Sequence, residues 1–286
     1  MRHPIVIALL SGSVFALSAC EDSSRASVTR AIDNVTSIDQ KNLAELMLVA
    51  GDPEEAVDFF TGQVEERPED IDMLRGLARS LTRARRGSEA VPVWRRVSQH
   101  PEATNDDRVM LADAYIRANN WDEAEKTLND IPPTHESFDR YRLEAMIADS
   151  KKQWSRADHF YETAAGLTTR PANVFNNWGY SKLTRGNPAE AEPLFMQALQ
   201  HDPNLFTAKN NLALARAGQG NYSLPLVRMT QHERAKMLFT MAIAAIRKGD
   251  TTIGRTLLQD AIDTHPQHYD EAVRALRALE SGGQSI

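Results

Sequence analysis

Small residues recur along the chain at an interval of about 34 positions. The clearest series is Ala56, Ala90, Ala124, Ala157 and Ala191, whose members are 34, 34, 33 and 34 positions apart. A second series lies twelve positions before each of these residues and continues beyond them: Ala44, Ala78, Ala112, Ala145, Gly179, Ala213 and Ala242. A large apolar residue follows each member of the first series by four positions: Phe60, Trp94, Leu128, Tyr161 and Phe195. Two small residues per unit let paired helices approach closely, so the pattern predicts stacked pairs of antiparallel helices.

Prolines and turn residues follow the same period. Proline lacks the amide donor and clashes with the preceding turn, so it predicts the end of each second helix, at Pro68, Pro101, Pro132, Pro171 and Pro203. Residues that favour tight bends separate the two helices of a pair: Gly51-Asp52, Arg86-Gly87, Asn119-Asn120, Gly186-Asn187, Gly220-Asn221 and Gly249-Asp250. The spacing resembles that of the tetratricopeptide repeat, which implies an all-α superhelix, an α-solenoid of antiparallel helix pairs.

The predicted solenoid covers residues 37–280 in about seven repeats. These are 37–70, 71–104, 105–137, 138–171, 172–205, an incomplete sixth from 206, and a seventh at 235–268. In the sixth repeat Pro225 replaces the alanine of the second helix, so residues 222–229 are predicted to be extended, either as a loop, which we favour, or as a partner site. Thr230 and Glu233 form a predicted capping box for the next helix. Residues 269–280 are expected to cap the solenoid, and residues 281–286 to form a disordered tail.

Composition argues for a globular protein that does not bind nucleic acid in general. The chain has 286 residues, of which 42% are hydrophobic and 25% charged, and its net charge is -6. Residues 1–19 hold one basic residue, so the remaining chain has 32 basic and 39 acidic residues, a net charge of -7. The eight histidines are scattered and no catalytic or metal-ligand motif is present, so we expect no enzyme activity, metal or cofactor. A periplasmic enzyme or enzyme regulator remains the less favoured alternative.

The N-terminal residues resemble a lipoprotein signal peptide. Arg2 and His3 precede an apolar run from Ile5 to Leu17, which ends in Leu17-Ser18-Ala19-Cys20. The run is shorter than the roughly 20 residues that a membrane-spanning helix needs. We therefore expect residues 1–19 to be removed, Cys20 to carry lipid, and residues 20–36 to form a flexible tether. The alternative is an ordinary signal peptide with a chance cysteine.

In tetratricopeptide arrays the first helix of each pair lines a concave groove, and polar residues of these helices are the candidate partner-binding groups. Arginines stand at Arg75, Arg79, Arg83, Arg117 and Arg142, the first three with a spacing of four that places them along one stripe. Asparagines recur 34 positions apart at Asn176, Asn177, Asn210 and Asn211, where their amides suit the backbone of an extended peptide. The alternatives are a solvated face balanced by acids such as Asp72, and asparagines that serve helix packing.

The lipobox, the repeats and the stretches at 176–182 and 206–213 together make the chain resemble TadD-type lipoproteins of tight-adherence (Flp) pilus systems. The resemblance implies a pilotin-like scaffold that assists the secretin or holds pilus assembly proteins, with the lipid anchor at Cys20 in the membrane. It also implies the periplasmic face of the outer membrane, although Glu21 and Asp22 leave the inner membrane open. Rival roles are in type IV pili, outer-membrane protein assembly or peptidoglycan synthesis.

Overall fold

The computed structural model describes residues 42–282, and every regular element in this range is a helix. This confirms the predicted all-α fold class. The chain forms two compact units, unit 1 up to Asn120 and unit 2 from Trp121. The signal peptide, Cys20, the tether and residues 283–286 lie outside the described residues, so the predictions made for them stay predictions.

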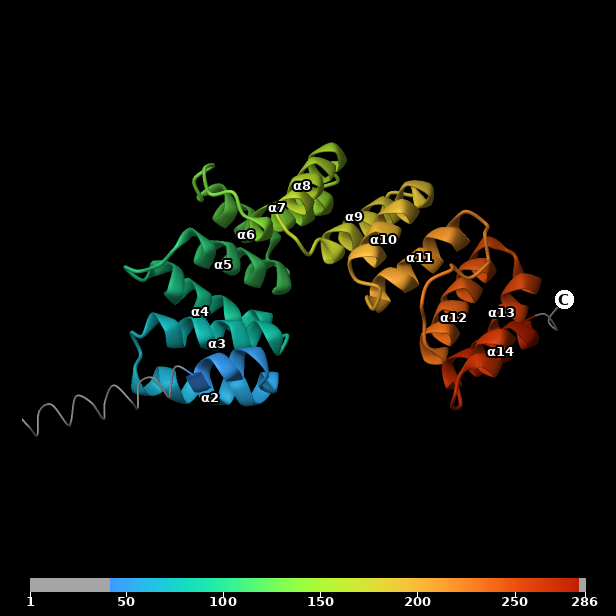
Figure 1. The fold of residues 1–286 in the computed structure, drawn as a ribbon, viewed down its shortest axis with the longest axis horizontal. Helices are drawn as coiled ribbons and strands as arrows, with labels where there is room; N and C mark the ends of the chain where they lie inside the picture. Colours follow the sequence, from blue (N-terminus) through green and yellow to red (C-terminus); the bar gives the residue numbers. More distant parts are fainter. Residues whose placement is uncertain (1–41, 283–286) are drawn as a thin grey trace, which may run out of the picture. The chain divides into compact units, whose positions relative to one another are not determined.

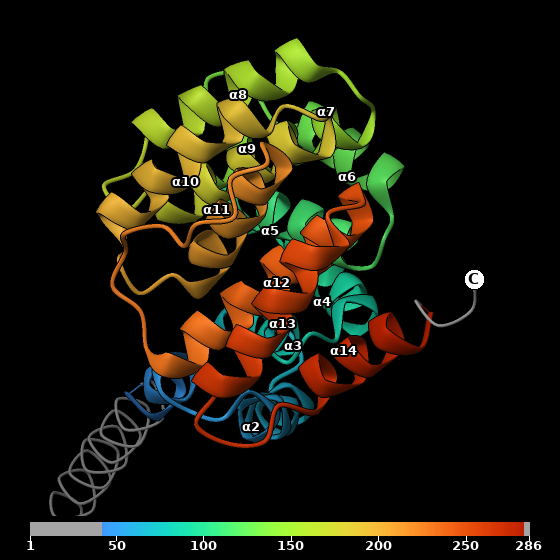
Figure 2. The same cartoon turned by 90° about the vertical axis from the view of Figure 1, so that its right-hand side faces the viewer.

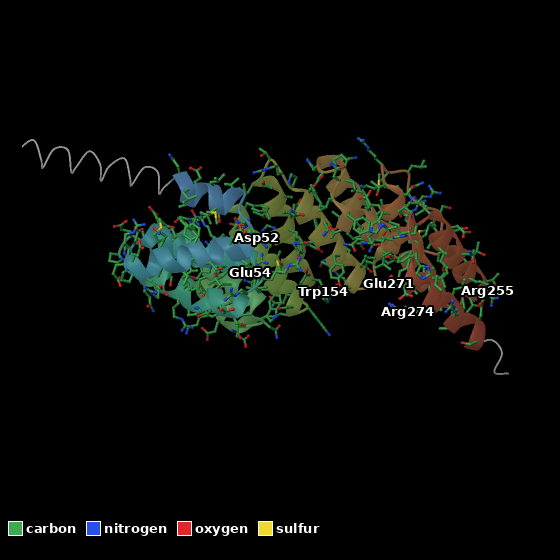
Figure 3. All side chains as sticks on the ribbon, turned by 90° about the horizontal axis from the view of Figure 1, so that it is seen from below. Asp52, Glu54, Trp154, Arg255, Glu271 and Arg274 are labelled. Carbon is green, nitrogen blue, oxygen red and sulfur yellow. The ribbon has the colours of Figure 1, made fainter. Side chains whose placement is uncertain are left out.

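Unit 1 consists of consecutive helices that pack in chain order, as Figure 1 shows. They are the helical residues 42–49, α2 (Pro53–Glu66), α3 (Ile71–Arg83), α4 (Gly87–Gln99) and α5 (Asn105–Arg117). Acceptor side chains begin three of them, because Asp52, Asp70 and Thr104 accept hydrogen bonds from the first amides of α2, α3 and α5. The cap on α2, Asp52, is labelled in Figure 3.

Unit 2 continues the helix pairs to the C-terminal end of the described chain. Its helices are α6 (Trp121–Asn129), α7 (Phe138–Ser150), α8 (Trp154–Gly166), α9 (Ala172–Thr184), α10 (Pro188–His201), α11 (Phe206–Gly218), α12 (Gln231–Lys248), α13 (Thr251–Thr264) and α14 (Asp270–Gly282). The last helix packs on α13, in the place expected for a capping helix, and it extends two residues beyond the predicted end at residue 280.

The residues of the two small series and of the large apolar series form the core, as predicted. The five alanines of the first series are fully buried, and the large apolar residues are at most 2% exposed. A Cβ atom on Gly179 would lie 2.7 Å from the ring of Phe195, and one on Gly76 would lie 2.2 Å from the ring of Phe60. Any side chain at these glycines would therefore displace an aromatic ring of the core.

The turn predicted at Arg86-Gly87 lies one position earlier, at Arg85-Arg86. Arg85 adopts the left-handed conformation, with φ 61°, whereas Gly87 is the buried first residue of α4. A Cβ atom at Gly87 would lie 3.0 Å from Cβ of Arg117, so this glycine permits close packing rather than a bend. The same left-handed conformation recurs at later turns: Asn119, Lys152, Gly186, Gly220 and Gly249.

Residues 221–230 connect α11 to α12 without a helix, as Figures 1 and 2 show in orange. Pro225 is buried, and the partly buried Leu224 and Val227 pack against the core of unit 2. The predicted capping box is present, because Thr230 accepts from the amide of Glu233 and the Glu233 carboxylate accepts from the amide of Thr230. The segment is therefore a packed connection that replaces the second helix of the sixth repeat.

Candidate functional site

One residue in each first helix follows directly after the small residue of the second series. We call these the row residues: Glu45, Arg79 and Asp113 in unit 1, and Met146, Tyr180, Leu214 and Ile243 in unit 2. Except for Asp113, every row residue lines a described cavity. The small residue beside each is buried, whereas the row residues other than Asp113, which is 6% exposed, are exposed or partly exposed.

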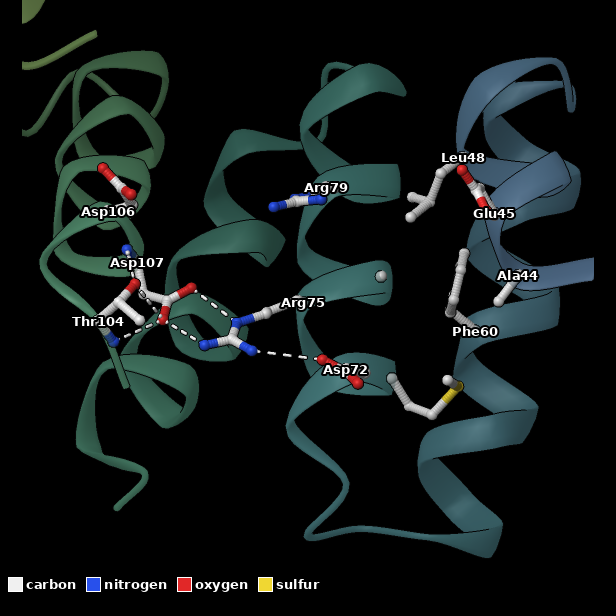
Figure 4. Close-up of a pocket in the computed structure, with 12 residues that line it drawn as sticks. Ala44, Glu45, Leu48, Phe60, Asp72, Arg75, Arg79, Thr104, Asp106 and Asp107 are labelled. Atoms are coloured by element: carbon white, nitrogen blue, oxygen red, sulfur yellow. Dashed lines mark hydrogen bonds and ion pairs between the residues drawn. The ribbon is translucent and has the colours of Figure 1, made fainter. Parts of the chain in front are cut away.

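The cavity of unit 1 has a volume of about 490 Å³, and half of its twelve lining residues are charged (Figure 4). Two cations line it, Arg75 and Arg79, and the acids that line it are Glu45, Asp72, Asp106 and Asp107. The acids therefore outnumber the cations, 4 to 2, among the lining residues. The cavity is not the basic strip that the arginine spacing suggests.

Arg75 is held by acids of its own unit. Its Nε and Nη2 atoms donate to the two oxygens of Asp107 at 2.9 and 2.8 Å, and Nη1 donates to Asp72 at 3.3 Å. Burial alone would raise the pKa of the Asp107 carboxyl, but hydrogen bonds from Arg75 and Thr104 outweigh it and hold that pKa below its usual range. The hydrogen bonds that Arg75 donates to Asp107 correspondingly raise the pKa of Arg75. This pair joins α3 to the start of α5.

Arg83 also has an internal role. Its guanidinium donates to the carbonyl oxygens of Met47, Leu48 and Gly51 at 2.8–3.0 Å. The carbonyls of Met47 and Leu48 belong to the last turn of the helical residues 42–49 and have no partner within that helix, so Arg83 caps it and also binds the turn that follows. Arg79, between the other two arginines, is exposed, lines the cavity and makes no hydrogen bond or ion pair with residues 42–282.

The other two predicted arginines are paired within their own helices. Arg117 donates to Asp113 at 2.5 Å, and Arg142 donates to Asp139 at 3.3 Å. They belong to different units, and neither lines a described cavity of its unit. Whether any of the five arginines contacts a partner stays a prediction.

Three of the four predicted asparagines connect neighbouring first helices of unit 2. The side-chain amide of Asn211 in α11 donates to Asn176 in α9 at 3.1 Å, and Asn210 accepts from the hydroxyl of Thr240 in α12 at 2.7 Å. Asn177 differs, because it lines a cavity and its Nδ2 atom donates to no described residue. The Nδ2 atom of Asn210 also donates to no described residue, but of the four asparagines Asn177 is the one that lines a described cavity.

The cavities of unit 2 were not foreseen, and they are mainly apolar. Met146 and Tyr180 line one of about 370 Å³, and Leu214 and Ile243 line another of about 400 Å³. The signal for them was present in the sequence, since these four residues follow the small residues of the second series. Sequence reasoning that searched for charged and amide side chains passed over them.

A polar network holds the helices around the first of these cavities. Asp149 accepts from the hydroxyls of Tyr161 at 2.9 Å and Ser181 at 2.6 Å. Asp158 accepts from Arg185 at 2.6 and 2.9 Å, and also from Trp178 and Lys182. Burial alone would raise the pKa of Asp158, but these hydrogen bonds lower it below its usual range. The network joins α7, α8 and α9, and its carboxylates already have partners.

Within residues 42–282, no helix is long and apolar enough to cross a membrane. The same residues contain no group of three histidines, cysteines or acids placed to hold a metal ion.

Comparisons with known proteins point to one family. Residues 97–147 match one tetratricopeptide-repeat family model and residues 176–224 match another. No curated protein matches the chain in sequence.

Solved structures agree with this fold. A chain of the APC/C hetero-tetramer Cut9–Hcn1 is similar with a TM-score of 0.59 and 14% identity, over 82% of this chain and 48% of that one. A thermophilic tetratricopeptide protein of Thermus thermophilus has a TM-score of 0.54 and 16% identity, over 61% of this chain and 95% of that one. Human IFIT1 in a dimer with m7Gppp-AAAA has a TM-score of 0.58 and 16% identity, over 79% and 58%.

The chain spans about half the length of the Cut9–Hcn1 chain that it matches. At these identities the likeness concerns the fold alone. The repeat spacing, the helix pairs and the two family matches show that residues 97–147 and 176–224 contain tetratricopeptide repeats and that the described residues have the fold of a tetratricopeptide superhelix.

Proposed function

We propose that this protein is a protein-binding scaffold that holds its partner on the row residues of the first helices. The observation that carries the proposal is the contrast between adjacent positions. Ala78 and Ala213 are fully buried, whereas their neighbours Arg79 and Leu214 line cavities. The small residue is therefore used in helix packing, and the row residue that follows it is accessible to another molecule. Tetratricopeptide scaffolds are generally non-catalytic, and we propose no enzyme activity for this chain.

The finer proposal is a pilotin-like lipoprotein of a tight-adherence (Flp) pilus system, anchored by lipid on Cys20 at the periplasmic face of the outer membrane. It is supported by the lipobox Leu17-Ser18-Ala19-Cys20 and by the resemblance of the repeat stretches to TadD-type proteins. A lipid anchor would confine the scaffold to the membrane and raise its effective concentration for an embedded partner. The proposed partners are a secretin or pilus assembly proteins, and not nucleic acid.

The anchor is tested separately from the partner. Metabolic labelling with palmitate should mark the wild-type protein and leave a Cys20→Ser variant unlabelled, and membrane fractionation should release that variant. Labelling of both proteins would reject Cys20 as the lipid site.

The partner is tested by affinity capture from native membranes, with wild type and an Arg79→Glu, Leu214→Ser variant as baits. Both substituted residues are accessible, so the variant should keep its fold. Enrichment of a secretin and pilus proteins by wild type alone supports the full proposal. Enrichment of type IV pilus, barrel-assembly or wall-synthesis proteins would reject the role in a Flp pilus system. Equal capture of the partner by both baits would reject the proposal that the row residues hold it.

A further inference from the structure

The row of unit 2 is apolar at all four positions. Met146, Tyr180, Leu214 and Ile243 are separated by 34, 34 and 29 residues, and each lines a cavity. Tyr180 is 53% exposed, and the other three residues are partly exposed. The structure therefore presents apolar side chains along consecutive first helices, at a position that unit 1 gives to charged residues. An apolar surface of this kind is stabilised when a partner covers it.

Charge at one end of the row restricts which partner fits. The cavity around Leu214 and Ile243 is lined by no acidic residue, and its lining includes Arg247 and Lys248. The ammonium group of Lys248 donates to the carbonyl of Gly218 at 3.0 Å and so caps α11. Arg247 is exposed and forms no hydrogen bond or ion pair with the described residues. Its guanidinium is free to receive a carboxylate of the partner.

The cavity at Met146 and Tyr180 is lined by no charged side chain that lacks a partner. The carboxylate of Asp149 lines it but already accepts the hydroxyls of Tyr161 and Ser181. Asn177, which lines the same cavity, offers a side-chain N–H that suits a peptide carbonyl. Apolar side chains and a backbone carbonyl of the partner fit here, and a charged side chain does not.

We propose that the row of unit 2 binds a peptide segment with regularly spaced apolar side chains and a carboxylate beyond the last of them, which pairs with Arg247. This inference rests on the proposed scaffold function and names the ligand chemistry of one of its grooves. Packed helices lie about 8–10 Å apart. An extended chain advances about 3.1 Å per residue. Apolar side chains at every third residue of an extended segment therefore recur at about the spacing of packed helices, which is the spacing that we infer for successive row residues.

The test uses a defined probe and the chain from residue 21 onward. The probe is a short fluorescein-labelled peptide with leucine at every third position and two aspartates at its C-terminal end. A second probe ends in two lysines and an amide, and a third carries serine in place of leucine. Fluorescence anisotropy should show binding of the first probe and binding of the third that is at least about tenfold weaker.

Matched variants locate the binding. Leu214→Ser and Ile243→Ser should each weaken binding of the first probe about tenfold. Leu226→Ser removes a fully exposed leucine outside the row and should leave binding unchanged. Arg247→Glu should weaken the aspartate probe about fivefold and favour the lysine probe, whereas Arg255→Glu, on α13 and labelled in Figure 3, should do neither. Circular dichroism verifies that each variant is folded.

Two outcomes overturn the inference. Equal binding of the leucine and serine probes would reject an apolar ligand, and equal effects of Arg247→Glu and Arg255→Glu would reject the carboxylate partner. The proposed function fails separately. If the wild-type protein captures pilus proteins from membranes while the probes do not bind, the scaffold role stands and this ligand chemistry falls. If the probes bind as expected but no pilus protein is captured, the ligand chemistry stands and the pilus role falls.

Discussion

Unit 1 and unit 2 use the same repeat to build two different surfaces. At the row position unit 1 has Glu45, Arg79 and Asp113, whereas unit 2 has four apolar or aromatic residues. The packing positions beside them do not differ in this way, since alanine or glycine occupies all of them. Close helix packing fixes the small residues, because a larger side chain would collide with the core. The row position has no such constraint, so its chemistry can change without altering the fold.

Both units join neighbouring first helices through an ion pair with a buried member. In unit 1, Arg75 with Asp107 links α3 to α5, and the Asp107 side chain is only 5% exposed. In unit 2, Lys209 with Glu233 links α11 to α12, and the Lys209 side chain is only 3% exposed. Unit 2 adds hydrogen bonds between amides and a hydroxyl, which link α9, α11 and α12. The chemistry of the row residues, and not the use of ion pairs, therefore distinguishes the two units.

The largest effects should come from the core rings and should stay within one unit. Phe60→Ala in unit 1 and Phe195→Ala in unit 2 should each lower the free energy of unfolding by about 3–5 kcal/mol, because each leaves a void against a glycine. Stability in repeat proteins depends on nearest neighbours. Hydrogen exchange should therefore accelerate in α2 and α3 for Phe60→Ala, and in α9 and α10 for Phe195→Ala. Met196→Ala, at an accessible residue, is the control, and equal loosening of both units would contradict independent behaviour.

Removal of a paired carboxylate should have the next largest effect in either unit. Asp107→Ala and Asp158→Ala should each cost about 2–3 kcal/mol at neutral pH, since each removes the shortest ion pair of a partly buried or buried arginine. Asp72→Ala, at an exposed carboxylate, should cost less than about 0.5 kcal/mol. Urea unfolding curves at neutral pH measure all three changes.

The pH dependence of these two effects follows from the lowered pKa of each carboxyl. A group whose pKa is depressed by folding contributes its stability above its unfolded pKa, about 3.9 for aspartate, and loses it as the pH falls through the folded value. The difference between wild type and Asp107→Ala or Asp158→Ala should be constant above about pH 5 and shrink below about pH 4. A difference that grows on acidification would contradict this assignment.

The capping boxes provide a matched pair with a smaller effect. Thr104 begins α5 in unit 1 and Thr230 begins α12 in unit 2 with the same reciprocal hydrogen bonds. Alanine at either position should lower the free energy of unfolding by about 1 kcal/mol. Thr252→Ala, at an exposed residue of α13, serves as the control. A much larger loss for Thr230→Ala than for Thr104→Ala would mean that the cap also holds the segment 221–230 in place.

The smallest effects should come from the row residues themselves. Arg79→Ala in unit 1 and Tyr180→Ser in unit 2 should change the free energy of unfolding by less than about 0.5 kcal/mol, because neither residue is buried. Arg75→Ala, four positions from Arg79, should cost about 1–2 kcal/mol through the loss of its bonds to Asp107. If urea unfolding shows a similar loss of unfolding free energy for Arg75→Ala and Arg79→Ala, the two arginines are equivalent, as their spacing in the sequence suggests.

Sequence reasoning predicted the helices well because helix pairs are encoded by local spacing. The small and large apolar series, the prolines and the capping box at Thr230 each depend on residues a few positions apart or on a repeated interval. The same reasoning failed at Gly87, where the constraint is the Cβ atom of Arg117 in a neighbouring helix, 30 positions away in the sequence. The sequence pattern also does not indicate the boundary between the two units, at Asn120 and Trp121, because the repeat spacing continues across it.

The sequence by itself determined the fold and the row positions, because burial in a repeat follows the period of the pattern. The tertiary structure decided which side chains at those positions are available. Arg75 and Arg79 look equivalent in the sequence, but an acid 32 residues beyond Arg75 binds the first and leaves the second exposed. The spacing of residues in the sequence shows which side chains share one helix face. An ion pair also requires that a residue of another helix places an oppositely charged group within about 3 Å.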